Sequence, residues 1–489
     1  MADTSPPSGS ASRRPILRDG ALQADLCIIG GGSGGLSVAA GAAQMGASVV
    51  LVEKHLMGGD CLNTGCVPSK ALLAAAHAAD AVRHGARFGV EAPSPTVDFA
   101  RVHAHVHGVI ASIAPHDSVA RFEGLGVTVI QAAARFTGPR EVEAGGHRIR
   151  ARRFVVATGS SAALPPVPGL AETPHLTNET VFGLTERPGH LVVLGGGPIG
   201  VEMAQAFRRL GAGVTLLERG AILPKDEPEA VAVVRAALRR DGVLIHEGVT
   251  VAGARRTETG IAIDIEGAAP VEGTHLLVAA GRRPNTAGLG LEAAGIEATP
   301  RGITVDARLR TTNAHVFAIG DVAGGPQFTH IAGYHAGIVI RNALFGLPAK
   351  VDYAALPWVT YADPELAHVG LTEAEARQAG HAVSLLMQDL AGNDRAQAEG
   401  TTAGLIKVVL GRGGRILGAT IVAPRAGEMI GVWGLAIQRR LRIGAIASSL
   451  APYPTMAEIS KRAAGCYYTP SLFGPRTRRL VGLVQRWLP

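Results

Sequence analysis

Cysteine and aromatic residues are scarce in this chain of 489 residues. It has four cysteines, and Phe, Trp and Tyr together make up 4% of the sequence. Four cysteines are too few to staple a secreted disulfide scaffold of this length. No run of about 18 apolar residues exists, so we expect no transmembrane helix. The N-terminal segment lacks an apolar core of signal-peptide length, so residues 1–24 are expected to be a disordered tail, and the default location is cytoplasmic.

Positive charge is concentrated at the C-terminal end. The formal net charge is +7, and the last fourteen residues contain Arg476, Arg478, Arg479 and Arg486. Residues 476–489 therefore read as a basic C-terminal tail that could form a short amphipathic helix and touch an anionic membrane weakly. The favoured alternative is a helix packed on its own domain or on a dimer mate. Nucleic acid is not an expected partner, because no basic stripe is interleaved with aromatic residues.

Glycine, by contrast, is abundant, and some of it forms a phosphate-binding pattern. The stretch ADLCIIGGGSGGLSVAAGAAQMGASVVLVEK contains an apolar strand, a turn with Gly30, Gly32 and Gly35, an alanine-rich helix, and a second strand closed by Glu53. These glycines allow a tight turn and the close approach of a pyrophosphate to the helix N-terminus, and the acid can bind a ribose hydroxyl. The complete βαβ unit predicts a dinucleotide site.

The same unit occurs a second time in the chain. HLVVLGGGPIGVEMAQAFRRLGAGVTLLER contains Gly195, Gly197, Gly200 and Glu218 at the spacing of the first unit. Two such units indicate an α/β protein that passes electrons between two dinucleotides, because each site alone would only bind. The alternative is that one unit is a degenerate structural copy.

Further strands end at residues suited to a nucleotide, and the pattern then changes. RRFVVATGS at 152–160 and HLLVAAGRRPN at 275–285 end at glycines, and Asp321 follows an apolar strand, where its carboxylate could bind a ribityl hydroxyl. After Leu347, strands such as GLIKVVL and RILGATIVA alternate with alanine-rich helices, which indicates a separate C-terminal domain. We expect domain boundaries near residues 157, 280 and 350.

Two of the four cysteines, Cys61 and Cys66, lie close together in GGDCLNTGCVPSK. In a regular helix they would be beyond disulfide reach, so a bridge requires a distorted turn. The glycine pair before Cys61, and Gly65, can supply it, and Pro68 suits the first turn of the next helix. The pair indicates redox or metal chemistry. A zinc half-site and a pair of buried cysteines are alternatives, but no nearby Cys/His cluster completes a tetrahedral site, so no metal site is predicted.

The ordered motifs resemble those of the pyridine nucleotide-disulfide oxidoreductases, the flavoprotein family of dihydrolipoamide dehydrogenase, glutathione reductase and mercuric reductase. The resemblance covers about residues 25 to 470 and rests on GGGSGG, GGDCLNTGCVPSK, ATGS, GGGPIG, GRRPN, AIGD and YPTMAE. It implies an α/β fold with two Rossmann-like dinucleotide-binding domains and a C-terminal α+β dimerisation domain. Residues 25–157 and 281–350 are expected to form the FAD-binding domain, 158–280 the NAD(P)-binding domain, and 351–475 the dimerisation or interface domain.

The resemblance also implies which residues hold the cofactors. It assigns to FAD the residues Gly30, Gly32, Gly35, Glu53, Lys54, Lys70, Ala133, Thr158, Gly159 and Asp321. It assigns to the nicotinamide cofactor the residues Gly195, Gly197, Gly200, Glu218, Gly281 and Arg282. Glu218 favours the free 2′-hydroxyl of NADH, whereas Arg219 beside it argues for NADPH. We expect NADH, because the acid stands at the ribose position, with NADPH as the alternative.

The same likeness gives roles to the cysteine pair and to a homodimer. Cys66 is the expected thiolate facing the flavin, and Cys61 is the thiol that meets the substrate after reduction of their redox-active disulfide. A helix N-terminus and a nearby lysine lower a thiol pKa. Lys70 is expected near the flavin ring with Glu202 as its ion-pair partner. Each site of the homodimer is expected to be completed by the opposite C-terminal domain.

The sequence departs from this family near its C-terminus. Members that act on small disulfides carry His-Pro-Thr-x-x-Glu there, and this chain has Tyr453 at the histidine position and keeps Glu458. A tyrosine pKa of about 10 is poorly matched to proton exchange at neutral pH, and general acid–base catalysis contributes a factor of about 10² to 10⁴ to the rate. Mercuric reductases also carry tyrosine there, and a soft metal ion exchanges thiolate ligands without a delivered proton.

Two mercuric reductase features are missing: an N-terminal metal-binding module with its own cysteine pair, and vicinal cysteines near the C-terminus. Cys466 is interpreted as a packed core residue rather than as their substitute. The leading hypothesis is an FAD-dependent NAD(P)H oxidoreductase that passes electrons through Cys61 and Cys66 to a soft metal ion or another acceptor needing no histidine acid. The alternatives are a dihydrolipoamide dehydrogenase-like enzyme and a non-catalytic redox-sensing flavoprotein.

Overall fold

The first part of the fold is built on an eight-stranded sheet, in a computed structural model that describes residues 13–488. The main strand order is β4-β3-β2-β7-β6-β5, with β1 on β2 and β19 on β7. The strands are β1 Ile16–Arg18, β2 Ala21–Ile29, β3 Val49–Glu53, β4 Thr128–Gln131, β5 Ala134–Gly138, β6 Glu141–Ala144, β7 His147–Val156 and β19 Val316–Ala318. Strands β2, β3, β4, β7 and β19 pair in parallel. Because β19 returns from far along the chain, two separate segments make this unit.

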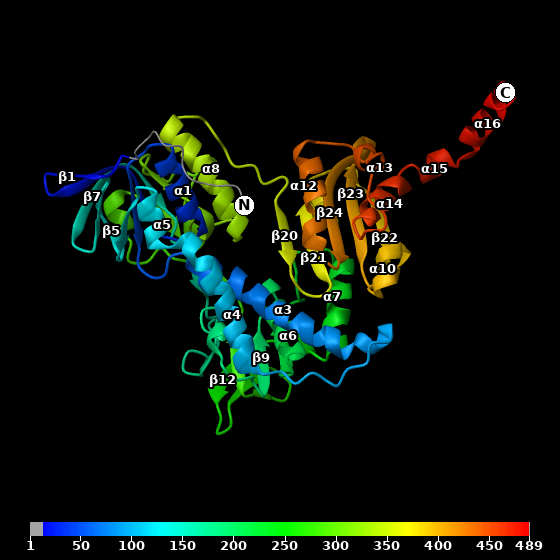
Figure 1. The fold of residues 1–489 in the computed structure, drawn as a ribbon, viewed down its shortest axis with the longest axis horizontal. Coiled ribbons are helices and arrows are strands. Elements are labelled where there is room, and N and C mark those ends of the chain that lie inside the picture. Colours follow the sequence, from blue (N-terminus) through cyan, green and yellow to red (C-terminus); the bar gives the residue numbers. More distant parts are fainter. Residues whose placement is uncertain (1–12, 489) are drawn as a thin grey trace.

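Helices cover this sheet, and the central strands are apolar throughout. All five residues of β3, VVLVE, are buried, as expected for a parallel strand with both faces covered. The helices of this part are α1 Ser33–Gln44, α2 Gly59–Asn63, α3 Cys66–Arg83, α4 Phe99–Ile113, α5 Val119–Gly124 and α8 Thr329–Phe345. In Figure 1, α1 and α8 lie side by side over the sheet.

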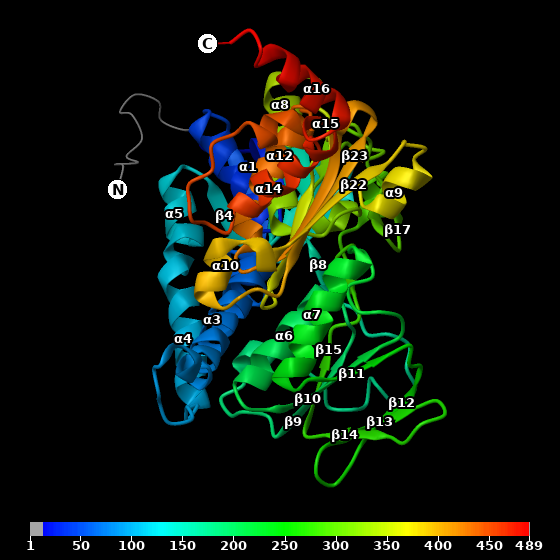
Figure 2. The same ribbon diagram turned by 90° about the vertical axis from the view of Figure 1, so that its right-hand side faces the viewer.

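The second unit has a four-stranded parallel sheet of order β11-β10-β9-β15 and a three-stranded antiparallel sheet. Figure 2 shows both sheets at the lower right, beneath α6 and α7. Their elements are β9 His190–Leu194, α6 Pro198–Arg209, β10 Gly213–Glu218, α7 Pro228–Asp241, β11 Leu244–Glu247, β12 Val251–Arg256, β13 Ile261–Ile265, β14 Val271–Gly273 and β15 His275–Val278. Two antiparallel strands, β8 Ser160–Ala162 and β16 Arg282–Pro284, carry the chain into and out of this unit.

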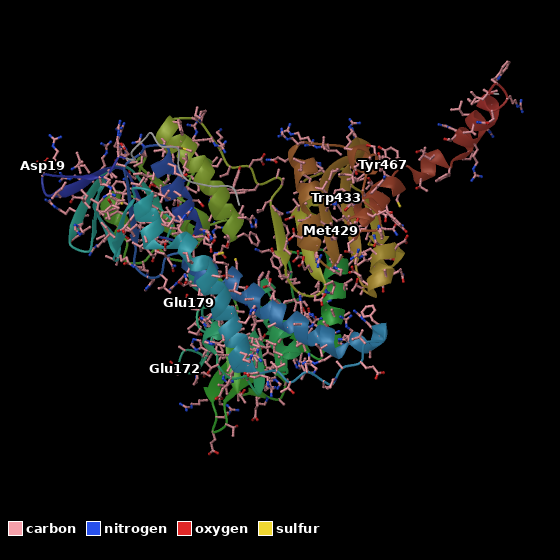
Figure 3. The ribbon with its side chains drawn as sticks, in the orientation of Figure 1. Asp19, Glu172, Glu179, Met429, Trp433 and Tyr467 are labelled. Carbon is pink, nitrogen blue, oxygen red and sulfur yellow. The ribbon has the colours of Figure 1, made fainter. Side chains whose placement is uncertain are left out.

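The C-terminal unit is a five-stranded antiparallel sheet of order β20-β21-β24-β23-β22 with helices around it. The predicted strands GLIKVVL and RILGATIVA are confirmed as β23 and β24. Trp433 is fully buried against the sheet and Met429 is nearly so; Figure 3 labels both in this unit. The elements are β20 Pro357–Thr360, β21 Glu365–Gly370, α9 Glu373–Gln378, β22 Ser384–Asp389, α10 Asp394–Glu399, β23 Leu405–Gly411, β24 Arg415–Ala423, α11 Ala426–Met429, α12 Gly431–Gln438, α13 Gly444–Ala447 and α14 Glu458–Cys466. A small hairpin, β17 Ala298–Thr299 with β18 Gly302–Ile303, precedes β19.

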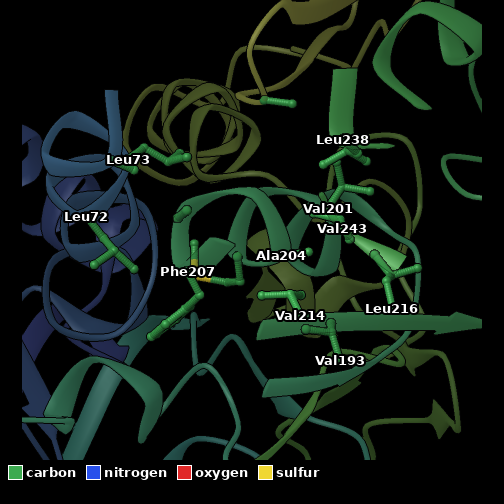
Figure 4. Packing of buried hydrophobic residues seen from close by; sticks show 14 of the residues in the cluster. Leu72, Leu73, Val193, Val201, Ala204, Phe207, Val214, Leu216, Leu238 and Val243 are labelled. Carbon is green, nitrogen blue, oxygen red and sulfur yellow. The ribbon is translucent and has the colours of Figure 1, made fainter. Parts of the chain in front are cut away.

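Helix α3 packs directly on α6 and so joins the first unit to the second. Leu72 and Leu73 of α3 lie in one buried cluster with Val201 and Phe207 of α6, and Figure 4 shows members of this cluster from both helices. Because α3 begins at Cys66, this packing fixes the cysteine segment relative to α6.

The predicted disordered tail at residues 1–24 is wrong for its last part. Residues 1–12 lie outside the described residues, but β1 pairs antiparallel with the start of β2. Asp19 and Gly20 between these strands have φ of 52° and 69°, the left-handed pair that a two-residue hairpin turn requires. Asp19 lies at the tip of this hairpin in Figure 3. The Asp-Gly dipeptide in ILRDGALQ was therefore a hairpin signal.

The basic tail forms the predicted helix. This helix is α16 Pro475–Val484, which follows the short helix α15 Thr469–Leu472, and it points away from the rest of the chain in Figure 1. Of the favoured alternative, packing on its own domain is not observed, because no residue of α16 is buried; packing on a dimer mate stays a prediction. No helix within residues 13–488 combines the length and the apolar character needed to cross a bilayer.

Candidate functional site

The two predicted dinucleotide turns have nearly the same geometry. Gly30 and Gly195 have φ of 114° and 115°. A Cβ added to Gly35 or to Gly200 would stand 1.9 Å from the carbonyl oxygen of the first glycine of its own motif. Only glycine permits this approach of helix to strand. Both predicted βαβ units are therefore present in full.

The middle glycines leave room for a ligand at the two helix N-termini. Gly32 and Gly197 are the N-cap residues of α1 and α6, and neither helix has a side-chain cap. A Cβ on Gly197 would meet no atom within 4 Å, and one on Gly32 would lie 3.8 Å from Gly59. Uncapped N–H groups beside open space suit an anionic pyrophosphate. The residues present therefore fit a dinucleotide at each turn.

The two acids brace these turns from the ends of the second strands. Glu53 Oε2 accepts a hydrogen bond from the Gly31 N–H at 2.5 Å. Glu218 Oε2 accepts one from the Gly196 N–H at 2.6 Å. Arg219, next to Glu218, is exposed. The preference for NADH over NADPH stays a prediction.

A cavity of about 2130 Å³ runs from the first glycine turn past the cysteines to the second turn and the C-terminal unit. Ligand pockets for small molecules commonly measure about 300 to 1,000 Å³, so this one has room for a dinucleotide. All the residues predicted for FAD line it except Gly35, which lies behind the turn: Gly30, Gly32, Glu53, Lys54, Lys70, Ala133, Thr158, Gly159 and Asp321. Of the residues predicted for the nicotinamide cofactor, Gly197 and Arg282 line it, whereas Gly195, Gly200, Glu218 and Gly281 do not.

The predicted distorted turn between the cysteines is confirmed. Helix α2, which contains Cys61, ends at Asn63, and α3 begins at Cys66. Gly65 between them has φ −131° and ψ −112°, outside the helical region. Both cysteines are free thiols in hydrogen-bonding contact. This arrangement corresponds to the reduced form of the predicted redox pair.

The environment makes the two thiols unequal. The pKa of Cys66 is lowered to about 6, chiefly because the Cys61 thiol donates a hydrogen bond to it; the Thr329 hydroxyl and the charge of Lys70 act in the same direction, against burial. The pKa of Cys61 is raised because Cys66 holds its proton and because it is buried. The Thr329 Oγ1 atom lies 3.2 Å from the Cys66 Sγ. At neutral pH Cys66 is therefore mainly a thiolate.

The predicted ion pair between Lys70 and Glu202 is also present. The Lys70 Nζ donates to Glu202 Oε2 at 2.8 Å. The ring of Tyr361, from the C-terminal unit, covers the same ammonium at 4.1 Å, and the Tyr361 N–H donates to Glu202 Oε1 at 3.0 Å. Tyr361 therefore contacts both members of the pair.

One face of α6 holds the segment that carries Tyr361. Gln205 exchanges two hydrogen bonds with the backbone of Asp363, at 2.7 and 2.9 Å, and Arg209 Nη1 donates to the Asp363 carboxylate at 2.7 Å. Glu202, Gln205 and Arg209 are spaced three and four residues apart, so they lie on the same side of the helix. This contact fixes the C-terminal unit against the lysine side of the cavity.

Arg282 lines the cavity close to Asp321, a residue predicted for FAD, and its assignment to the nicotinamide cofactor stays a prediction. Its Nε donates to Ser160 Oγ at 2.7 Å, and its guanidinium lies 3.1 Å from Asp60 Oδ2 and 3.8 Å from Asp321 Oδ2. The antiparallel pairing of β16 with β8 brings it there. Burial raises the pKa of Asp321, against a hydrogen bond from Ser160.

Tyr453 and Glu458 do not line the cavity of their own chain. Tyr453 is 68% exposed, and its hydroxyl donates to Asp394 Oδ2 at 2.8 Å. This bond raises the pKa of the phenol. Glu458 accepts from Arg462 Nε at 3.2 Å. Their predicted delivery to the cysteines by a second chain stays a prediction.

Cys466 is not the packed core residue that we expected. It is exposed at the last residue of α14, beyond the buried Ala463 and Ala464, with Gln388 Oε1 at 3.7 Å from its Sγ. Within residues 13–488, no three His, Cys, Asp or Glu side chains come together as a metal-binding group.

Two residues beside the cysteines were missed in the sequence. Thr329 contacts Cys66, and Tyr361 contacts Lys70. Neither carries a local signal, because Thr329 is the first residue of an ordinary helix and Tyr361 precedes a common Asp-Pro turn. Only the tertiary contacts identify them.

Two family models match most of the chain. The model described as pyridine nucleotide-disulphide oxidoreductase matches residues 24–336, and the dimerisation domain of the same name matches residues 356–464. A mercuric reductase of Streptomyces lividans is 38% identical over 451 residues, covering 90% of this chain and 95% of that protein. A dihydrolipoyl dehydrogenase of Thermus scotoductus is 38% identical over 453 residues, covering 90% and 96%.

Solved structures give the same grouping. The HOCl-induced flavoprotein disulfide reductase RclA of Escherichia coli superposes with a TM-score of 0.81 at 29% identity, over 90% of this chain and 99% of that one. LpdA of Mycobacterium tuberculosis superposes with a TM-score of 0.83 at 27% identity, over 90% and 99%. The similar proteins agree in architecture and differ in the acceptor that their names give.

Proposed function

Because the chain belongs to the pyridine nucleotide-disulphide oxidoreductases, we propose that it passes electrons through Cys61 and Cys66 to a soft metal ion. It is an FAD-dependent enzyme with NAD(P)H as the electron donor, so the hypothesis of a non-catalytic sensor is dropped. When bound, FAD supplies the transfer of an electron pair from the nicotinamide to the cysteine pair. The acceptor is the part that the proposal adds.

The residues that would hold the cofactors follow the cavity. We assign Gly30, Gly32, Gly35 and Glu53 to the FAD pyrophosphate and ribose, and Asp321 to its ribityl chain. The second turn, Gly195, Gly197, Gly200 and Glu218, would hold the nicotinamide dinucleotide. The sheet pairings support the proposed division into FAD, NAD(P) and dimerisation domains, because β19 joins the first sheet and β8 pairs with β16 at the crossing. A cytoplasmic location stays a prediction.

The observation that carries the metal-ion proposal is the state of Tyr453. Reduction of a small disulfide releases a thiolate that needs a proton, and a phenol whose pKa is raised by its bond to Asp394 is a poor donor of one. A divalent soft ion needs none. The Cys66 thiolate and the Cys61 thiol would displace two ligands from the ion, and the Cys61 proton would leave with one of them. The two sulfurs would then give an electron pair to the ion, which is reduced to the metal, while Cys61 and Cys66 are oxidised to their disulfide.

The test is an anaerobic assay of the holoenzyme with NADH or NADPH and three acceptors: Hg(II) held by excess thiol, lipoamide and glutathione disulfide. We expect turnover with the metal ion that is lost in Cys66→Ser, and little turnover with either disulfide. Tyr453→Phe is the matched control, because it removes only the hydroxyl. Lipoamide turnover faster than metal turnover would overturn the proposal, most directly if Tyr453→Phe abolished it.

A second candidate, disulfide reduction of the dihydrolipoyl dehydrogenase kind, is favoured by one observation. The Glu458 Oε2 atom is buried and has no hydrogen-bond partner among the described residues. Glu458 follows residue 453 by five positions, so its carboxylate could accept a hydrogen bond from a donor at position 453. In Tyr453→His, an imidazole could use it. We expect this variant to gain lipoamide turnover by about 10² if the missing acid alone limits the rate.

A further inference from the structure

The C-terminal arm, defined here as residues 469–488, stands clear of the remainder of the chain. Figure 1 shows α16 as the outermost part of the molecule, beyond α15 and the C-terminal unit. After Val484 the helical bonding continues, since the Gln485 N–H donates to the Val481 carbonyl and the Leu488 N–H to that of Val484. No residue of α15 or α16 is buried. The arm is therefore a formed helix with no covered face.

The arm carries a continuous apolar stripe. At about 100° per residue, its apolar side chains span an arc of roughly 160°. Each of them is at least 41% exposed, and Trp487 is 83% exposed. The stripe consists of Leu480, Val481, Leu483, Val484, Trp487 and Leu488. A stripe of this width in water indicates that something covers it.

The opposite face of the arm is positive and holds no negative charge. Arg478, Arg479 and Arg486 lie on that face, whereas Arg476, in the first turn of α16, lies within the arc of the apolar stripe. No Asp or Glu follows Glu458. A basic face opposed to an apolar stripe with an exposed tryptophan is the pattern of helices that lie in the interface of an anionic bilayer. The positive charge of the arm therefore favours a negatively charged surface as its partner.

We propose that the C-terminal arm docks on an anionic lipid surface, with its apolar stripe among the acyl chains and its arginines at the headgroups. One short helix binds a bilayer weakly. The chain carries the dimerisation domain of its family, so a homodimer presents two arms and gains from their joint binding. The proposal does not depend on the electron acceptor.

A second copy of the chain is a less suitable occupant. Four of the apolar residues that the C-terminal unit exposes, Val432, Leu435, Leu441 and Leu450, are accompanied by Arg439, Arg440 and Arg442. This patch has the same sign of charge as the arm. Two arms would also repel each other, because neither has an acidic residue to pair with the arginines of the other.

The experiment is co-sedimentation of the holoenzyme with vesicles of phosphatidylglycerol and phosphatidylcholine, compared with vesicles of phosphatidylcholine alone. The charge variant is Arg476→Gln/Arg478→Gln/Arg479→Gln. Its matched control is Arg239→Gln/Arg255→Gln/Arg256→Gln, which removes the same number of exposed charges from the second unit. A third variant, Leu480→Ser/Leu483→Ser, breaks the stripe and keeps the charge. NAD(P)H oxidation in solution should be unchanged in all three.

We expect binding to the anionic vesicles that falls about a hundredfold in the charge variant, since each arginine near the surface contributes about fivefold. The stripe variant should also lose binding, the control should keep it, and 1 M salt should weaken it because the screening length falls to about 3 Å. Equal binding to neutral vesicles, or an unaffected charge variant, would overturn the proposal. Loss of the dimer on deleting residues 475–489, without vesicle binding by the intact chain, would assign the arm to a second copy.

Discussion

Replacement of Thr329 by valine isolates one contribution to the acidity of Cys66. The hydroxyl lies 3.2 Å from the Cys66 sulfur, and valine has nearly the same shape without a donor. A hydrogen bond to a charged group contributes about 1.5 kcal/mol, and one pKa unit corresponds to about 1.4 kcal/mol. We therefore expect the pKa of Cys66 to rise from about 6 to about 7.

The assay is alkylation of the NAD(P)H-reduced enzyme by iodoacetamide across pH 5 to 9, with the labelled cysteine identified by peptide mass. The thiolate forms as the pH rises through the pKa, so at pH 6.5 the alkylation rate of Cys66 should fall about threefold in Thr329→Val and stay unchanged near pH 9. Thr329→Ser keeps the hydroxyl and should match the wild type. An identical pH profile for wild type and valine variant would refute the assigned role of Thr329.

Three further predictions concern the glycines of the cofactor turns, the contact of Tyr361 with Lys70, and the buried ion pairs of Lys407. Gly35→Ala should abolish FAD binding, seen as loss of the flavin spectrum, whereas Gly200→Ala should keep the flavin and weaken NAD(P)H binding in a fluorescence titration, because each Cβ would meet a carbonyl at 1.9 Å. Tyr361→Leu should raise the pKa of Cys66 by a few tenths of a unit in the alkylation assay, because it removes the contact of the ring with the Lys70 ammonium, worth about 1 kcal/mol. Tyr361→Phe keeps the ring and should leave the pKa of Cys66 unchanged. Lys407→Met should lower the unfolding free energy by about 3 to 5 kcal/mol in a urea titration, because its ammonium, 3% exposed, pairs with three carboxylates that would then face one another. The exposed pair of Arg310 offers the comparison, and Arg310→Met should cost about 1 kcal/mol or less.

The parts of the site that follow from short-range sterics were predictable from the sequence. In each βαβ turn, a helix packs so close to a strand that only glycine fits, and the spacing of these glycines can be recognised in the sequence. The break between Cys61 and Cys66 was found in the same way, from the glycines around the pair. The hairpin at Asp19 had an equally local signal, which was overlooked because the surrounding segment was polar. The ion pair of Lys70 with Glu202 came from the family resemblance.

Residues that reach the site through tertiary contacts could not be predicted. Thr329 meets Cys66 only because α8 lies along α1, and Arg282 reaches Asp60 only because β16 pairs with β8. Tyr361 depends on the match between the Tyr361–Asp363 segment and one face of α6. In each case the side chain type is ordinary, and its role follows from which element it packs against.

The residues around the Cys66 thiolate and the residue on which the proposed acceptor depends lie in different parts of the molecule. Cys61, Cys66, Thr329, Lys70, Glu202 and Tyr361 meet within one chain, so the thiolate is prepared by contacts that the chain makes with itself. Tyr453 and Glu458 lie outside that cavity. Relatives named for a metal ion and relatives named for a disulfide substrate can therefore share the first set of contacts. Our proposal for the acceptor rests instead on Tyr453, which does not touch the thiolate within its own chain.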